Sequence, residues 1–340
     1  MAAYKVVLAY INGAIIDEVP VGNLTFGFAL NEPGSCSFTV ALRDPKCTKA
    51  ILAPGEREVR VYRDGILVWA GYLWTAYASW GEGHVRFACE GFISRLRHRL
   101  VTSNLTYTST EQFDIAWNLI AHTQAKTDGS LGFTRGGEAN SGVNATRKYA
   151  QFERPNILEE IEGLAESGTG FDYEITPDKV FHMYYPEKGS NKLVNFELGK
   201  NIGGLSYDVD SVSIINTVHA IGAGEGELTC IASAINTTSR AKYGLMEESY
   251  SFQNIKRFDT LQTLANEQLA VNKDARFQPQ ANITGTDPVW TTLAVGDRAT
   301  ILGDYGYMEL DDSFRIVTML VQLDNTGNEQ YQVTFEAIPT

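Results

Sequence analysis

The residues able to act as acids, bases or metal ligands are spread thinly along this chain. Its five histidines stand far apart and form neither an HxH nor an HExxH pattern; they are His84, His98, His122, His182 and His219. A metal centre or a general base needs several such groups converging in one cleft. We therefore interpret each histidine as a surface or packing residue, and we expect neither catalytic residues nor a metal site.

Two pairs of carboxylates are close enough in sequence to act together. Asp208 and Asp210 are two residues apart in a predicted strand, so they project from the same face. Asp311 and Asp312 follow a glycine-containing turn, where a cation would find two oxygen ligands. A solvent-facing strand and a solvated loop give the same patterns, and we favour these simpler interpretations.

The segment Gly222-Ala-Gly-Glu-Gly226 resembles a phosphate-binding loop in its glycines alone. It lacks the Gly-Lys-Ser/Thr ending, no helix is predicted after it, and Glu225 would repel a phosphate group. We interpret it as a turn. With no acid dyad, no nucleophile–histidine pair and no cofactor motif, the sequence predicts a protein that is not an enzyme and holds no cofactor.

The four cysteines are scattered and include no Cys-x-x-Cys pair. Cys36 and Cys89 fall in alternating strand patterns, where a buried thiol acts as a small apolar residue. We expect these two, with Cys47 and Cys230, to be structural thiols rather than disulfides or metal ligands.

Residues 1–105 carry the signals of antiparallel β-structure. Asn12-Gly13 and Asp64-Gly65 supply the positive φ angles that two-residue hairpin turns require. Apolar residues alternate with polar ones in three runs, Leu24–Leu30, Cys36–Leu42 and Val85–Cys89. One apolar face per strand at this strand density predicts a small barrel or sandwich. A short helix is expected at the end of the segment, over 92–100.

Residues 106–204 predict a small α/β module. Thr108 and Glu111 have capping-box spacing before an apolar helical stripe that runs from Phe113 to Ile120. Pro155-Asn156 begins a second predicted helix. A strand pair follows it, over Phe171–Thr176 and Val180–Tyr185.

Residues 205–340 return to β-structure with one helical interruption. Strands are expected near 205–221, 293–302, 313–323 and 330–338. A helix is expected over 258–272, with Leu261, Leu264, Ala265 and Leu269 on its apolar face. Asp259 and Gln262 have the spacing of an N-cap pair.

The net charge of −13 is unevenly distributed. Residues 1–105 contain 11 Lys and Arg and 9 Asp and Glu, residues 106–204 contain 9 and 14, and residues 205–340 contain 8 and 18. Tight nucleic-acid binding depends on cations that neutralise phosphates, so this balance argues against it. A hydrophobic content of 44% with 20% charged residues excludes a disordered chain. No apolar run approaches the ~20 residues that span a bilayer.

Three stretches of sequence occur in a particular order. Glu58–Gly71 and Phe87–Leu96 predict a hairpin, a strand and a short closing helix. Asn156–Gly170 predicts a helix before a strand pair, and Asn216–Gly222 leads through the helix of 258–272 to Leu293–Asp297. This order of elements resembles the phage tail hub or tail-tip family, the baseplate hub-like minor tail proteins of bacteriophages.

The resemblance implies a mainly β fold with an α+β module. It divides the chain into a first hub β-barrel (1–105), an α/β peripheral module (106–204), a second hub β-barrel (205–239 with 285–340), and a helical insertion (240–284) that packs with the peripheral module. In this family the two antiparallel β-barrel domains of three subunits form a pseudo-sixfold ring. Such a ring caps the tail tube and lines the DNA exit channel.

The implied role is that of a structural virion protein of the viral tail tip. Its expected partners are two further copies in a homotrimer, distal tail or tail tube proteins above, and tip or receptor-binding proteins below. DNA would pass during ejection without specific binding, and there is no membrane segment. The expected location is the virion, after assembly in the cytoplasm of the host bacterium.

Two groups of side chains follow as candidates within that ring. The acidic balance suggests a channel wall that repels DNA phosphates, and its lumen-facing candidates are Asp208, Asp210, Asp297, Asp311 and Asp312. The slightly basic first third suggests contact with an acidic neighbour through Arg95, Arg97 and Arg99, with a solvated helix face over the barrel as the alternative. The further interface candidates Trp69, Trp74 and Trp80 are expected in the barrel core and at a subunit interface, where aromatic residues bury large areas. The alternatives are a distal tail protein and a carbohydrate-binding adhesion module of the tail tip.

Overall fold

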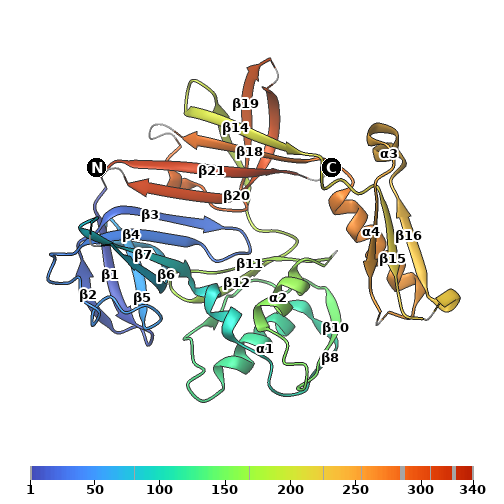
Figure 1. Cartoon of the computed structure of the whole chain (residues 1–340), viewed down its shortest axis with the longest axis horizontal. Helices are drawn as coiled ribbons and strands as arrows, with labels where there is room; N and C mark the ends of the chain where they lie inside the picture. The colour runs from blue at the N-terminus through green and yellow to red at the C-terminus, as the bar shows by residue number, and fades with distance from the viewer. Residues whose placement is uncertain are drawn as a thin grey trace. The chain divides into compact units, whose positions relative to one another are not determined.

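The computed structural model describes residues 2–79, 81–167, 169–224, 226–253, 255–283, 288–306, 308–323 and 327–338 (Figure 1). The chain forms two compact units. The larger unit contains Met1–Leu205 and Ala281–Phe335, and the smaller contains Ser206–Gln280 and Glu336–Thr340. The fold is mainly β with an α+β part, as the sequence predicted.

The first β region of the larger unit is an antiparallel array of seven strands in the spatial order β3-β4-β7-β6-β5-β1-β2. The strands are β1 (Tyr4–Tyr10), β2 (Ile15–Val19), β3 (Gly22–Ala29), β4 (Ser35–Ala41), β5 (Arg57–Arg63), β6 (Ile66–Ala78) and β7 (His84–Gly91). Both predicted hairpin turns are confirmed. Gly13 and Gly65 have φ angles of 88° and 82°, the left-handed region that glycine adopts without strain.

The second β region comes from later parts of the chain. Its strands are β13 (Asn191–Glu197), β14 (Ile202–Asp210), β18 (Arg276–Ile283), β19 (Arg298–Tyr305), β20 (Met308–Leu323) and β21 (Glu329–Ala337), with the short helix η3 (Trp290–Thr292) before β19. Strands β14 and β18 lead the chain into and out of the smaller unit.

The two β regions form one sheet, because β20 pairs with both. Its first half pairs with β19, and its second half pairs antiparallel with β3 from Thr318↔Ala29 to Gln322↔Thr25. Over the described residues the strand pairings follow an open path from β14 to β2, with β19 and then β13 branching from β20. Neither region therefore closes into the expected separate barrel. The physical reason is that β20 occupies the edge of β3 that a closed first barrel would pair with its own strands.

The module between the β regions contains η1 (Phe92–His98), β8 (Leu105–Glu111), α1 (Gln112–Gln124), β9 (Thr134–Arg135), β10 (Asn144–Tyr149), α2 (Ile157–Ala165), β11 (Asp172–Ile175) and β12 (Val180–Tyr184). Helix α2 begins where expected, after Asn156, whose side chain caps it by accepting from the backbone N–H of Leu158 at 2.9 Å. The expected cap Thr108 lies instead within strand β8. Glu111 caps α1 itself, and its carboxylate accepts from the N–H of Phe113 at 2.8 Å.

The expected boundary at 105/106 falls within a shared hydrophobic core. Tyr72 of β6 and Phe92 of η1 lie in the same buried cluster as Phe113 of α1 and Ile157 of α2. The rings of Tyr72 and Phe92 make an edge contact, with their centroids 5.2 Å apart. The first β region and the middle module are therefore parts of one unit.

The smaller unit is a three-stranded sheet with a helix against it. Its elements are β15 (Thr217–Ile221), η2 (Gly226–Leu228), β16 (Ile231–Ile235), α3 (Thr237–Tyr243), β17 (Glu247–Ser251) and α4 (Phe258–Asn272). Helix α4 has the predicted bounds, and Leu261, Ala265 and Leu269 pack on β15 and β16. Arg257 precedes α4 without a side-chain cap, so Asp259 is a first-turn residue and not the expected cap.

The expected division at 239/240 falls inside this unit. We assigned residues 205–239 to the second barrel, but β15 pairs with β16 and β17 and belongs to the smaller unit. The β-structure expected near 205–221 is present, but a turn after Asp210 divides it into β14 and β15, which belong to different sheets.

One buried carboxylate joins the three parts of the larger unit. Asp172 of β11 is 6% exposed and accepts from the Asn31 side chain at 2.9 Å and the Lys188 N–H at 2.6 Å. It also forms a buried ion pair with Arg315 of β20. The side chain of Asn31 in turn accepts from the Tyr173 N–H at 2.8 Å. Asp172 thus connects the middle module to both β regions.

A second cluster joins the two β regions directly. Glu329 of β21 accepts from the Tyr4 hydroxyl at 2.6 Å and from Nε of Arg63 at 2.5 Å. Burial alone would raise the pKa of Glu329, but the hydrogen bonds from Arg63 and Tyr4 and the charge of Arg63 together hold it below its ordinary value. Burial and the bond to Glu329 raise the pKa of Tyr4.

Replacing Asp172 should destabilise the larger unit strongly. Asp172→Asn keeps the size of the side chain but removes the buried charge that pairs with Arg315, which then retains only the more distant Glu187 at 4.0 Å. Breaking a buried ion pair in this way costs up to about 3–5 kcal/mol of unfolding free energy. Urea denaturation followed by tryptophan fluorescence measures the loss. Asp178→Asn, in the exposed turn between β11 and β12, is the matched control. Equal stability of the two variants would contradict the role given to Asp172.

The Glu329 cluster should make stability depend on acid pH. Since the folded-state pKa of Glu329 lies below the unfolded value of about 4.3, its contribution is fully present above that value and is lost as the pH falls through the folded pKa. Unfolding free energies of the wild type and Glu329→Gln, measured from about pH 7 to about pH 3, should converge on acidification. A difference that does not change with pH would be inconsistent with this cluster.

Candidate functional site

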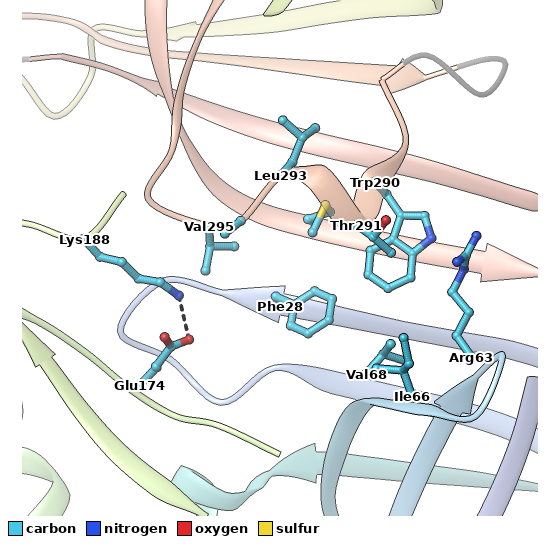
Figure 2. A pocket seen from close by; sticks show the side chains of 12 residues that line it. Phe28, Arg63, Ile66, Val68, Glu174, Lys188, Trp290, Thr291, Leu293 and Val295 are labelled. Atoms are coloured by element: carbon cyan, nitrogen blue, oxygen red, sulfur yellow. Dashed lines mark hydrogen bonds and ion pairs between the residues drawn. The ribbon is translucent and has the colours of Figure 1, made fainter. Parts of the chain in front are cut away.

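The larger unit contains an apolar pocket of about 400 Å³ where its three parts meet (Figure 2). Its walls come from β3, the turn between β5 and β6, η3 with the loop after it, and β20, with β11 and the segment before β13 on one side. The lining residues are Phe28, Arg63, Ile66, Val68, Glu174, Lys188, Trp290, Thr291, Leu293, Ala294, Val295 and Met319.

Trp290 forms the centre of one wall. It is 4% exposed, and its ring lies 5.6 Å from that of Phe26 and 6.1 Å, nearly parallel, from that of Phe28. The Arg63 guanidinium lies 5.9 Å from the Trp290 ring centroid, a cation–π contact. Trp290, which precedes β19 of the second β region, is therefore held in a fixed orientation by β3 and β5 of the first.

The charged groups at the rim are paired within the chain. Lys188 donates to Glu174 at 2.6 Å, the contact drawn in Figure 2, and the Tyr184 hydroxyl donates to the same carboxylate at 2.7 Å. Burial, followed by the charge of Glu174, raises the pKa of Tyr184. Ile66 is 69% exposed and extends the apolar surface outwards. The pocket can accept an apolar side chain, and the charges of Lys188 and Glu174 at its rim are paired with each other.

The expected interface tryptophans lie in different environments. Trp69 is 3% exposed, and its indole N–H donates to the Gly27 carbonyl at 3.2 Å, so it belongs to the core and not to an interface. It begins a run of five consecutive buried residues in β6, Trp69–Leu73. Trp74 is partly buried, with its N–H donating to Ser94 at 2.9 Å. Trp80 lies outside the described residues.

The expected arginine cluster does not form one free surface. The Arg95 guanidinium lies 5.3 Å from the Tyr72 ring centroid and 5.4 Å from that of Trp74, and Arg97 pairs with Glu90 at 2.6 Å. Arg99 is partly buried, and burial, with the nearby charge of Arg95, lowers its pKa. Two of the three arginines are thus satisfied by contacts within their own subunit.

The expected lumen-facing acids separate into two groups. Asp297 is 3% exposed and accepts from the Ser190 N–H at 2.9 Å and the Ala294 N–H at 2.8 Å, so it fixes the turn before β19 and cannot face a channel. Asp311 and Asp312 are exposed on β20 in the larger unit. Asp208 and Asp210 are exposed on β14 in the smaller unit.

The described residues hold no group of three or more His, Cys, Asp or Glu side chains that could bind a metal. The four cysteines are free thiols, as expected. Among the helices that the structure describes, none has the length and apolar character needed to cross a bilayer. Sequence reasoning missed Asp172, Glu329 and Trp290, which stand alone in the sequence and acquire partners only through the fold.

The same fold occurs in solved structures of phage proteins. The 43 kDa tail protein of prophage MuSo2 from Shewanella oneidensis matches with a TM-score of 0.71 at 12% identity, over 99% of both chains. The tail protein of Neisseria meningitidis MC58 gives 0.65 at 15% identity, over 98% of this chain and 97% of that one. Prophage tail protein gp18 from Listeria monocytogenes EGD-e gives 0.62 at 12% identity, over 99% and 95%.

No protein-family model matches the chain, nor does the sequence of any curated protein. Because the three matched structures share so little sequence with this chain, the likeness is one of fold, and it extends over nearly the whole length of each matched protein. The chain has the fold of phage tail proteins, as its resemblance to the tail hub and tail-tip family predicted.

Proposed function

We propose that this chain is a structural hub protein of a phage tail tip, or of a related injection machine, and not an enzyme. Three copies form a pseudo-sixfold ring that caps the tail tube and surrounds the DNA exit channel. The observation that carries the proposal is the likeness to prophage tail proteins, which extends over 99% of both chains for the 43 kDa protein of prophage MuSo2. A match of that extent covers the order of all elements and not one shared domain.

The construction of the larger unit supports a ring-forming role. Its two β regions lie in one sheet and are tied by one buried and one partly buried ion cluster, so we treat them as a rigid double segment. Three rigid double segments provide six similar positions around a threefold axis. The apolar pocket with its paired rim charges has the composition of an interface core, where burial of apolar area provides the attraction.

The charge distribution supports an exit channel that does not retain DNA. Phosphates are repelled by carboxylates, and a wall that bound them would slow ejection. With Asp297 buried, we assign the channel-facing role to Asp208 and Asp210, which are exposed on one strand. Tail tube or distal tail proteins would bind above the ring, and tip or receptor-binding proteins below it.

The purified chain should form particles with three times its mass of 37.5 kDa. Light scattering behind a sizing column measures this directly, and imaging of the same fraction should show a ring. A mass of six chains would favour a distal tail protein instead. A monomer that also fails to bind the tail tube would contradict the proposed function.

A further inference from the structure

Three segments of the larger unit bring a group of cations together. The stretch from Arg99 to Thr102 lies between the end of α1 and the loop before α2. Its backbone pairs with that loop through Ile157 N–H to Arg99 O and Val101 N–H to Pro155 O, both 2.9 Å. On its other side, Lys126 donates to the Leu100 carbonyl. Arg99, Lys126 and Arg154 are thereby held near one another.

Among the described residues, these three cations have no carboxylate partner. Within the described residues none of them forms an ion pair, whereas Arg97 and Arg95 nearby are satisfied by Glu90 and by aromatic rings. Burial and the charges of Arg99 and Arg154 lower the pKa of Lys126. Burial and the charge of Lys126 likewise lower the pKa of His122, which accepts from the Thr102 N–H at 3.2 Å. The group stores repulsion that a bound acidic surface would relieve.

Apolar side chains accompany these cations. Phe152 is 84% exposed two residues before Arg154, and Leu100 is 42% exposed beside Arg99. We name the set of Arg99, Leu100, Lys126, Phe152 and Arg154 the basic patch. Exposed apolar residues among unpaired cations favour an acidic protein surface as the occupant, because a protein partner can bury the phenylalanine while it neutralises the charges.

A complementary surface lies on the same chain. Residues 281–340 contain nine Asp and Glu against two Lys and Arg. In their β19–β20 hairpin, Asp304, Asp311 and Asp312 are exposed and, among the described residues, unpaired. We name this surface the acidic hairpin. Within the larger unit, β19 and α1 lie at opposite ends of the view in Figure 1, so the two surfaces cannot meet in one copy.

We propose that the basic patch of one copy binds the acidic hairpin of the next, with Phe152 and Leu100 buried at the contact. Because two different surfaces meet, the contact is heterologous, the type that closes into a ring when the rotation between copies is suitable. The inference rests on the proposed function, whose trimer it supplies with an interface. It assigns Asp311 and Asp312 to contact between subunits and leaves Asp208 and Asp210 for the channel.

The test uses the full chain and charge reversal. Arg99→Glu with Arg154→Glu should raise the dissociation constant of self-association at least about tenfold. Adding Asp311→Arg and Asp312→Arg to the same chain restores opposite charges across the contact and should recover association. Lys49→Glu with Lys148→Glu makes the same change at two exposed lysines outside the patch and should leave association unchanged. Sedimentation velocity over a range of concentrations provides the constants.

Carbodiimide coupling provides an independent test, because it links an amine only to a carboxylate in direct contact with that amine. The wild type should yield a Lys126–Asp311 or Lys126–Asp312 link between copies, and Lys126→Arg should lose the link while it keeps association. If Arg99→Glu with Arg154→Glu leaves the trimer as stable as the wild type, the inference is overturned while the proposed function still stands. A wild-type chain that never self-associates would also overturn the inference. In that case, binding to the tail tube tests the proposed function separately. Duplex DNA bound through Arg99 and Arg154, with self-association unaffected, would overturn it in favour of nucleic acid.

Discussion

The larger unit depends on the need to compensate one buried negative charge. An ionised carboxylate away from water is tolerated only with paired charge and full hydrogen bonding. Asp172 obtains both from Asn31, from the backbone of Lys188 and from Arg315. These donors come from the first β region, from the segment between β12 and β13, and from β20. The carboxylate is therefore satisfied only when all three segments are in place. Misplacing any of the three segments leaves a charge uncompensated.

The pocket is a consequence of the same arrangement. The Lys188 N–H bonds Asp172 and the Lys188 side chain bonds Glu174, so the residue that completes the buried site also forms the pocket rim. Arg315 contacts the Lys188 carbonyl at 3.2 Å from the other side. On the opposite wall, Arg63 is shared between Glu329 and the ring of Trp290. Stability and surface chemistry therefore rest on the same few side chains.

Local patterns in the sequence predicted local structure well. The two hairpin turns, the Asn156 cap and the bounds of α4 follow from glycine positions, capping chemistry and a period of 3.6 residues. The joining of two β regions by β20 was missed, because pairing between Thr318 and Ala29 leaves no signal in either segment. Asp297 was misplaced for a related reason: its charge suggested an exposed position, whereas its partner Ser190 is distant in sequence.

The ladder between β3 and β20 also constrains how the chain is made. Strand β3 ends at Ala29, yet the strand that covers its edge begins at Met308. During synthesis, at about 5–20 residues per second, that edge waits tens of seconds with its backbone donors and acceptors unpaired. An exposed strand edge is a template for pairing with other chains. Neighbouring nascent copies on one message therefore compete with β20 for the same edge, and correct assembly depends on β20 emerging before they meet.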